Sequence, residues 1–219
     1  MIKSGLIKAA LLLACLCCFS PEALCNGSVT GDVHISESDS SSETVQYGTV
    51  TGKVDVTLPR YRKGIVVYLK GAPERVVPGK ATIDQKNLKF IPHVVAVPIG
   101  SAVSFVNNDK VNHDIFSANA CKKFDIDDFH PGSSLTMTFD KACEINLLCD
   151  LHPEMSGYLI VVDSNHIAVT GEDGNFTIGA VPSGTYEVAV WSEKLKPQRK
   201  MTITVNRGET SSIVIDMKK

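Results

Sequence analysis

One run of seven residues limits the folds open to this chain more than any other feature. Cys149, His152 and Met155 follow one another at intervals of three residues, and an isolated His113 lies 36 residues before the cysteine. The segments on either side of the run, 144–148 and 158–162, are rich in aliphatic and β-branched residues, which is typical of short strands. We therefore expect a tight loop between two strands, in a fold that brings the strand end at His113 beside that loop.

The four side chains predict a metal site. Two imidazoles, one thiolate and one thioether are the donors of a blue-copper electron-transfer centre, in which a His₂Cys plane is completed by a long, weak axial methionine. Taken singly, the cysteine is compatible with a buried thiol or half of a disulfide, the second histidine with an exposed loop residue and the methionine with core packing. Zinc is an alternative occupant, although a thioether is a poor ligand for it. Their joint occurrence favours copper bound by His113, Cys149, His152 and Met155.

A wider pattern surrounds these residues. The segments Phe-Ile-Pro-His-Val-Val-Ala-Val-Pro-Ile-Gly (90–100) and Val-Ser-Phe-Val-Asn (103–107), followed by Asn112-His113 and the Cys-x-x-His-x-x-Met run, resemble cupredoxins. The short ligand loop, with Pro153 after the second histidine, is most similar to that of amicyanin. The resemblance covers roughly residues 79–163. It implies a Greek-key β-sandwich that holds one type 1 copper ion and acts as an electron carrier.

Three carboxylates depart from the cupredoxin pattern. Asp114 stands where cupredoxins usually carry Asn, whose amide ties the ligand loops together, and Asp150 directly follows the cysteine. Two carboxylates close to one thiolate repel each other if both are ionised, so we expect one to be protonated or turned to solvent. Glu154 replaces an apolar residue of amicyanin-type loops. A red-copper variant of the site, with Glu154 as a ligand, is therefore an alternative.

The cysteines outside the run allow a further expectation. Four of the seven lie in the first 25 residues, which leaves Cys121 and Cys143 as an even pair beside Cys149. In a cupredoxin the strand that leaves the first histidine and the strand that enters the cysteine are antiparallel neighbours. Each of the two cysteines has the same parity as the ligand on its own strand, and hence faces the same side. The resemblance thus implies a disulfide between Cys121 and Cys143; two separate buried thiols are the alternative.

The N-terminal region predicts export. Lys3 and Lys8 precede an apolar stretch, residues 9–19, that is too short to span a bilayer. We expect residues 1–25 to be a signal peptide, and the mature protein to be periplasmic or extracellular, with no transmembrane segment after cleavage. The alternative is a lipid anchor through Cys15, which ends a weak lipobox. Residues 26–46 are Ser-rich and acidic, which predicts a disordered linker.

The C-terminal region resembles a second family. Asp173-Gly174 lies between two alternating segments and predicts a β-hairpin. The pieces Asp-Gly-x-Phe-x-Ile (173–178) and Val-Pro-x-Gly-x-Tyr (181–186) are similar to carboxypeptidase regulatory-like modules, which are small prealbumin-type β-sandwiches. The strands that usually begin such modules, Gly-x-Val-x-Gly-x-Val and Val-Tyr-Leu, lie upstream at 48–54 and within 64–69.

This displacement predicts an inserted domain. We expect residues 47–72 and 164–219 to form one discontinuous sandwich, with the cupredoxin region, 79–163, inserted into it. Val50, Val54 and Val67 should then contact a C-terminal set that includes Phe176, Ile178, Tyr186 and Val188. Two tandem domains, with 47–72 forming edge strands of the cupredoxin region, are the alternative.

Composition narrows the function. Short strands separated by turn residues indicate an all-β protein, a cupredoxin sandwich plus a second small sandwich. The net charge of −2, with no basic cluster, argues against nucleic acid as a partner. We expect a non-enzymatic one-electron carrier that exchanges electrons through His152 with a redox protein such as a c-type cytochrome or a periplasmic dehydrogenase. The alternative is an extracytoplasmic binding or adhesion module with a structural or storage copper site, and a third, weaker possibility is a copper enzyme.

Overall fold

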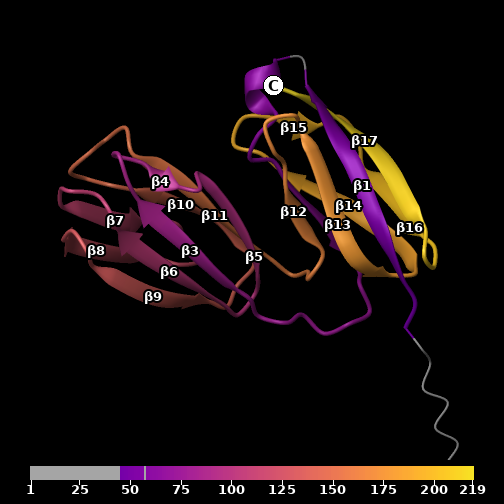
Figure 1. The fold of residues 1–219 in the computed structure, drawn as a ribbon, viewed down its shortest axis with the longest axis horizontal. Helices are drawn as coiled ribbons and strands as arrows, with labels where there is room; N and C mark the ends of the chain where they lie inside the picture. The colour runs from indigo at the N-terminus through magenta and orange to yellow at the C-terminus, as the bar shows by residue number, and fades with distance from the viewer. Residues whose placement is uncertain (1–44, 57) are drawn as a thin grey trace, which may run out of the picture. The chain divides into compact units, whose positions relative to one another are not determined.

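The computed structural model describes residues 45–56 and 58–219, and its regular structure is almost entirely β-strand (Figure 1). In this part of the chain there are seventeen strands and one short 3-10 helix, η1 (Pro59–Tyr61). The expected signal peptide, residues 1–25, and most of the expected linker, residues 26–46, lie outside the described residues. Among the residues described, no helix has the length and apolar character needed to cross a membrane. The predicted all-β class is confirmed.

The strands between residues 80 and 162 form a first sandwich of two sheets. In spatial order, one sheet consists of β4 (Phe90–Ile91), β3 (Lys80–Gln85), β6 (Ser101–Asn107) and β9 (Ser134–Phe139). The other consists of β5 (Val94–Pro98), β11 (Ser156–Val162), β10 (Cys143–Leu148), β7 (His113–Ser117) and β8 (Phe124–Phe129). The pairs β3·β6 and β5·β11 are parallel, and the other pairs are antiparallel.

The sequence of β6 explains how this sandwich is filled. Every second residue of the strand is buried, among them Val103 and Phe105, while the residues between them are partly exposed. Successive side chains of a strand point to opposite faces, so this alternation gives the sheet one apolar face. That face meets the apolar face of the other sheet, which contributes Ile115, Ile145 and Leu159 to the same core.

The remaining strands form a second sandwich from both sides of the first in the sequence. One sheet has the order β13 (Asn175–Pro182), β1 (Tyr47–Val56), β17 (Thr210–Lys218) and β15 (Lys196–Pro197). The facing sheet has the order β12 (Ile167–Val169), β2 (Val66–Lys70), β14 (Gly184–Trp191) and β16 (Met201–Val205). Strands β1 and β2 therefore pair with strands that lie more than one hundred residues later in the chain.

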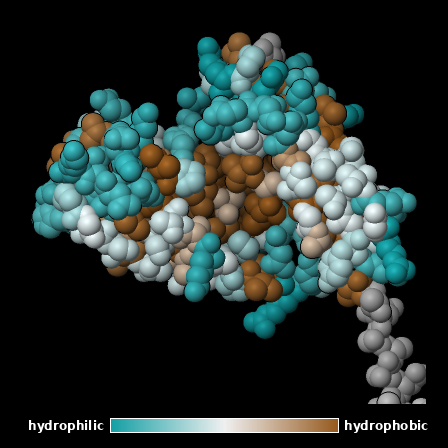
Figure 2. Space-filling view, in the orientation of Figure 1, coloured by the Kyte–Doolittle hydropathy of each residue, from teal (hydrophilic) through white to brown (hydrophobic). Residues whose placement is uncertain are grey.

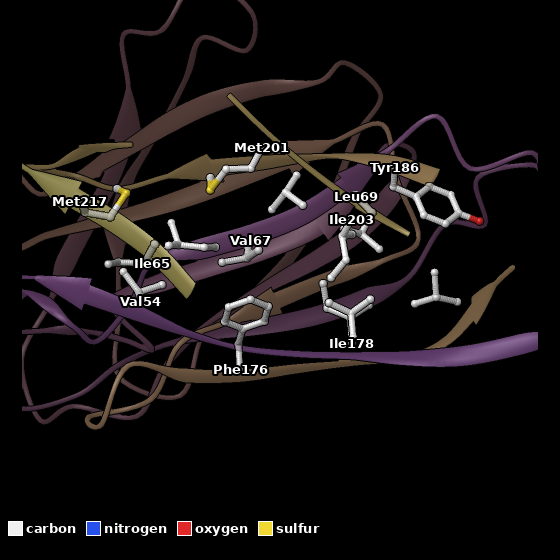
Figure 3. Packing of buried hydrophobic residues seen from close by; sticks show 14 of the residues in the cluster. Val54, Ile65, Val67, Leu69, Phe176, Ile178, Tyr186, Met201, Ile203 and Met217 are labelled. Atoms are coloured by element: carbon white, nitrogen blue, oxygen red, sulfur yellow. The ribbon is translucent and has the colours of Figure 1, made fainter. Parts of the chain in front are cut away.

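The core of the second sandwich contains the contacts that the displaced motif predicts. Val54 and Val67 pack in one buried cluster with Phe176, Ile178 and Tyr186 (Figure 3). Gly52 of the Gly-x-Val-x-Gly-x-Val motif pairs with Phe176 across the sheet, and a Cβ atom at Gly52 would lie only 2.5 Å from the phenyl ring. Glycine is therefore needed at position 52, because the absence of a side chain there makes room for the ring of Phe176.

The predicted hairpin at Asp173-Gly174 is wrong. The turn exists, with Gly174 at a φ of 77°, but β12 before it pairs with β2 and β13 after it pairs with β1, in the facing sheet. The chain thus crosses from one sheet to the other at this turn. The local pattern predicts the turn and the two strands, whereas the upstream strands β1 and β2 determine their pairing.

The expected disulfide is present. Cys121, which follows β7, is joined to Cys143, the first residue of β10. The two strands are antiparallel neighbours, with Leu148 paired to Phe116. Cys143 begins β10 and Cys149 follows its end, so the disulfide lies at the opposite end of that strand from the ligand loop. The disulfide therefore fastens the sheet away from the predicted metal site.

The two cores hold the largest buried side chains. Among the residues that the structure describes, all of the largest fully buried side chains belong to the two clusters already described. Figure 2 shows one face of the molecule, on which hydrophilic residues predominate and hydrophobic residues occupy smaller areas. Single exposed hydrophobic residues are common on soluble proteins and need no special explanation.

Candidate metal centre

The predicted ligands lie at the start of one strand and on the loop that joins the next two strands in the sheet. His113 is the first residue of β7, Cys149 directly follows β10, and Met155 directly precedes β11. The strands β7, β10 and β11 are neighbours in one sheet, and each neighbouring pair is antiparallel. The start of β7, the end of β10 and the start of β11 therefore lie at the same end of that sheet. The seven-residue run therefore forms a loop across this end, as its spacing predicts, and the remote histidine lies beside it.

Three potential ligand atoms converge on one point. The distance between the Nδ1 atoms of His113 and His152 is 3.2 Å. The Sγ atom of Cys149 is 4.0 Å from the first of these nitrogens and 3.7 Å from the second. A triangle of this size has a point about 2.1 Å from all three corners, which matches metal bonds of roughly 2.0–2.3 Å to imidazole nitrogen and thiolate sulfur. These three residues can hold a metal ion.

The two imidazoles present nitrogen atoms to the same point. The Nε2 atom of His113 lies 3.2 Å from a carboxylate oxygen of Asp109, so Nε2 carries the proton and donates it, and Nδ1 keeps its lone pair. That lone pair faces the Nδ1 atom of His152 and the sulfur of Cys149. Two nitrogen lone pairs and a thiolate aimed at one point are favourable only with a metal ion or a proton there.

The sulfur of Cys149 is shielded and hydrogen-bonded. The residue is only 3% exposed, and the backbone N–H of Asp114 donates to its Sγ atom at 3.4 Å. Thiolate is the form of cysteine that binds metals, and a hydrogen bond to the charged form favours it. The backbone next to His113 therefore donates a hydrogen bond to the sulfur of Cys149.

A bulge shapes the strand that carries His113. The pairing of β7 with β8 shifts register between His113 and Ile115, and Asp128 opposite has a φ of 50°. One carboxylate oxygen of Asp114 accepts the N–H of Asp128 at 3.2 Å. Bulges near functional sites re-aim side chains. The side chain of Asp114 thus ties the ligand strand to β8, in contrast to the loop-bridging amide of the cupredoxin pattern.

The two carboxylates next to the thiolate are separated, as expected. Asp114 is almost fully buried and points to β8, whereas Asp150 is exposed to solvent. Glu154 is exposed as well, and it does not belong to the group of side chains that converge on the point between the histidines. The arrangement gives no support to Glu154 as a ligand.

Met155 lies inside the protein beneath the loop. It is 1% exposed and belongs to the same buried cluster as Cys149, and its backbone N–H donates to the carbonyl of His152 at 2.8 Å. This hydrogen bond closes a turn that brings the thioether to the interior side of the ligand loop. Its role as the axial ligand stays a prediction.

Asp109 is a functional candidate that the sequence did not single out. In the sequence it is one residue of a polar segment, Asn107-Asn-Asp-Lys110, and its position four residues before His113 is the one local signal. The N–H of Leu88 is the main group that holds the pKa of Asp109 below its usual range, followed by the N–H of Lys110 and the side chain of His113. The carboxylate is therefore ionised at neutral pH.

Comparison with known sequences assigns part of the chain. Residues 154–218 match the family described as carboxypeptidase regulatory-like domain. This range contains β11 to β17 and hence most of the second sandwich, including the Asp173-Gly174 turn. No curated protein matches the chain in sequence.

Solved structures similar to the chain include copper proteins. A novel purple cupredoxin from Nitrosopumilus maritimus is 23% identical, with a TM-score of 0.35, over 37% of this chain and 99% of that one. The Cu(I) form of a mutant amicyanin is 18% identical, with a TM-score of 0.36, over 44% of this chain and 98% of that one. The copper-containing nitrite reductase of Thermus scotoductus SA-01 is 23% identical, with a TM-score of 0.36; the match covers 51% of this chain and 28% of the reductase.

Proposed function

We propose that the chain is an exported, non-enzymatic type 1 copper protein that carries one electron at a time. The observation that carries this proposal is the triangle formed by two histidine Nδ1 atoms and one cysteine Sγ atom at the edge of a β-sheet. In this proposal Met155, which is buried in the same cluster as Cys149, supplies the thioether of the blue-copper donor set. Copper bound there supplies one-electron chemistry by cycling between Cu(II) and Cu(I).

Each residue has a distinct task in this proposal. Cys149 supplies the thiolate, and its burial keeps water from the sulfur. His113 is fully buried and held by Asp109, so it provides a rigid corner of the site. His152 is partly exposed on the loop and is the point at which electrons enter and leave. A site fixed by two strand ends needs little rearrangement when the charge changes.

The visible spectrum of the copper-loaded protein tests the proposal. An intense blue band at one copper ion per chain is the expected result, because a thiolate bound to Cu(II) in a trigonal site absorbs strongly. A red or green protein would mean a different ligand set, with Glu154 the first candidate to examine. A protein that stays colourless after copper loading would contradict the proposed function.

Met155→Leu is expected to keep the blue colour and to raise the reduction potential. Leucine has nearly the same volume, so the fold should lose less than about 1.5 kcal/mol. The weak axial donor is lost, which disfavours Cu(II) relative to Cu(I). Spectroelectrochemical titration measures the potential, and Met137→Leu on β9 of the same sandwich is the matched control. Loss of bound copper, or a lower potential in Met155→Leu, would rule out the axial role.

The surroundings of His152 favour a basic partner. Asp150 and Glu154 lie on either side of His152 within the loop, and both are exposed, as is the hydrophobic side chain of Leu151. We propose that an exported redox protein with a lysine-rimmed surface, such as a c-type cytochrome or a periplasmic dehydrogenase, docks here. Complementary charges raise association rates more than they raise affinity.

Asp150 and Glu154 form an acidic rim beside His152, and removing their charges should slow electron transfer to a basic c-type cytochrome. In the double variant Asp150→Asn/Glu154→Gln, we expect a lower second-order rate constant at low salt and a weaker dependence on ionic strength, since screening acts on exposed charges. Stopped-flow kinetics measures both. Asp163→Asn, which removes an exposed carboxylate beyond the far end of β11, is the control. Equal rates for all three proteins would exclude docking at this rim.

A second candidate function rests on the second sandwich. The match of residues 154–218 to a regulatory-like family favours an extracytoplasmic binding or adhesion module, in which the copper site is structural or serves storage. We also propose that residues 47–72 and 164–219 form one discontinuous domain with the copper-binding region inserted. The shared core of β1, β2 and the C-terminal strands supports this division.

A further inference from the structure

The carboxylate of Asp109 contacts the buried His113 on the side of the ring that faces away from Cys149 and His152. One oxygen of Asp109, Oδ2, lies 3.2 Å from Nε2 of His113. The imidazole is completely buried and the side chain of Asp109 is 15% exposed, so little water competes for this hydrogen bond. The contact therefore links the proposed metal site to the loop between β6 and β7.

Other groups hold this carboxylate in place. The N–H of Leu88 donates to Oδ2 at 2.9 Å, and the N–H of Lys110 donates to Oδ1 at 2.9 Å. The backbone N–H of Asp109 donates to the side chain of Asn107, also at 2.9 Å. Asn107 is itself fully buried, and its amide donates to the carbonyls of Val111 and Phe129. The oxygen that faces His113 is thus positioned by two loops and a buried amide.

This arrangement determines which nitrogen of His113 is free. A carboxylate only accepts hydrogen bonds, so Nε2 must carry a proton, and in the neutral imidazole this leaves the lone pair on Nδ1. A carboxylate on the far nitrogen of a metal-bound histidine also makes the imidazole a stronger donor. Stronger donation and a nearby negative charge both stabilise the more highly charged metal ion.

We propose that Asp109 is a positioning residue that holds His113 in the Nε2–H tautomer and favours Cu(II) over Cu(I) at this site. The preference for Cu(II) rests on the proposed copper function, whereas the tautomer role does not. The tautomer role concerns the protein without metal and is tested separately.

The redox half is tested with Asp109→Asn, which keeps the shape of the side chain and removes its charge. Its amide oxygen can still accept from Leu88 and His113 at the position of Oδ2, while the N–H of Lys110 loses its acceptor. Cu(II) affinity is expected to fall by roughly 10–100-fold, and Cu(I) affinity by less. A difference of tenfold between the two losses corresponds to a rise in potential of about 59 mV for one electron. Competition titrations with Cu(II) and Cu(I) chelators and spectroelectrochemistry measure these changes.

Asp84→Asn is the matched control for the redox half. Asp84 lies near the end of β3 and accepts the N–H of Asn108, in the same loop as Asp109, at 3.3 Å, and it is not among the hydrogen-bond partners of His113. Its removal tests the general effect of one lost charge. An equal potential shift in both variants, or no shift in Asp109→Asn, would overturn the tuning role.

The tautomer half is tested in the metal-free protein by nitrogen-15 NMR of the histidine side chains. The wild-type spectrum should show His113 protonated only on Nε2, and Asp109→Ala should show a mixture of tautomers or an Nδ1–H form. Retention of a pure Nε2–H signal in folded Asp109→Ala would overturn the positioning role. If the wild-type protein binds no copper, the proposed function fails, while this NMR result still decides the role of Asp109.

Discussion

Replacing Cys149 with serine should abolish the intense visible absorption of the copper-loaded protein. The band requires charge transfer from a thiolate to Cu(II), and a serine hydroxyl at this position is neither as soft a donor nor ionised. His113 and His152 remain in Cys149→Ser, so weak copper binding can persist without the blue colour. Absorption spectra at matched copper content make the comparison.

The control for this variant removes sulfur elsewhere in the same sandwich. Cys121→Ser/Cys143→Ser breaks the disulfide, which costs about 2–4 kcal/mol of stability. Because the disulfide lies at the other end of β10, the folded fraction should keep its colour. A blue Cys149→Ser protein would show that the ligand assignment is wrong.

Leu69→Ala should destabilise the second sandwich by about 2–5 kcal/mol, because a fully buried leucine is replaced and a cavity remains. Leu69 lies on β2, is completely buried and pairs with Val188 of β14. Trp191, the only tryptophan of the chain, ends β14 and also contacts Glu144 of β10 and Tyr158 of β11. Its fluorescence during urea unfolding therefore reports the loss of structure around β14 together with these contacts. The prediction thus tests whether the upstream strand stabilises the C-terminal ones.

Leu135→Ala on β9 is the control for this stability change. Leu135 is 40% exposed, so its truncation should change the free energy of unfolding by less than about 0.5 kcal/mol. If Leu69→Ala shifts the tryptophan transition no more than this control does, β2 does not belong to the folding unit of β14. The discontinuous domain would then have to be abandoned.

The convergence of His113, Cys149 and His152 could be predicted from the sequence because two of these residues lie in one short run and the third follows a recognisable strand. Three donors at intervals of three residues leave few structures other than a metal loop, and a strand on each side places that loop at a sheet edge. The disulfide was predictable for a related reason, since strand parity connects Cys121 and Cys143 to the ligands on their own strands. The contacts of Val54 and Val67 followed from recognisable motifs that were displaced in the chain.

Features that depend on distant partners were not predictable. The Asp173-Gly174 turn has the residues of a hairpin, yet the strands it joins enter facing sheets because β1 and β2 provide their partners. Asp109 resembled an ordinary loop residue, and only the fold brings its carboxylate to the far nitrogen of His113. The register shift in β7 likewise arises from β8 and leaves no local pattern.

An anaerobic redox titration of the copper-loaded protein tests the central claim most directly. Copper content is measured first, and the visible band is then followed while reductant and oxidant are added in turn. The expected result is one copper ion per chain, full bleaching by one electron and full recovery of the blue colour on reoxidation. A protein that binds copper but takes up no electron reversibly, or that releases the metal on reduction, would contradict it.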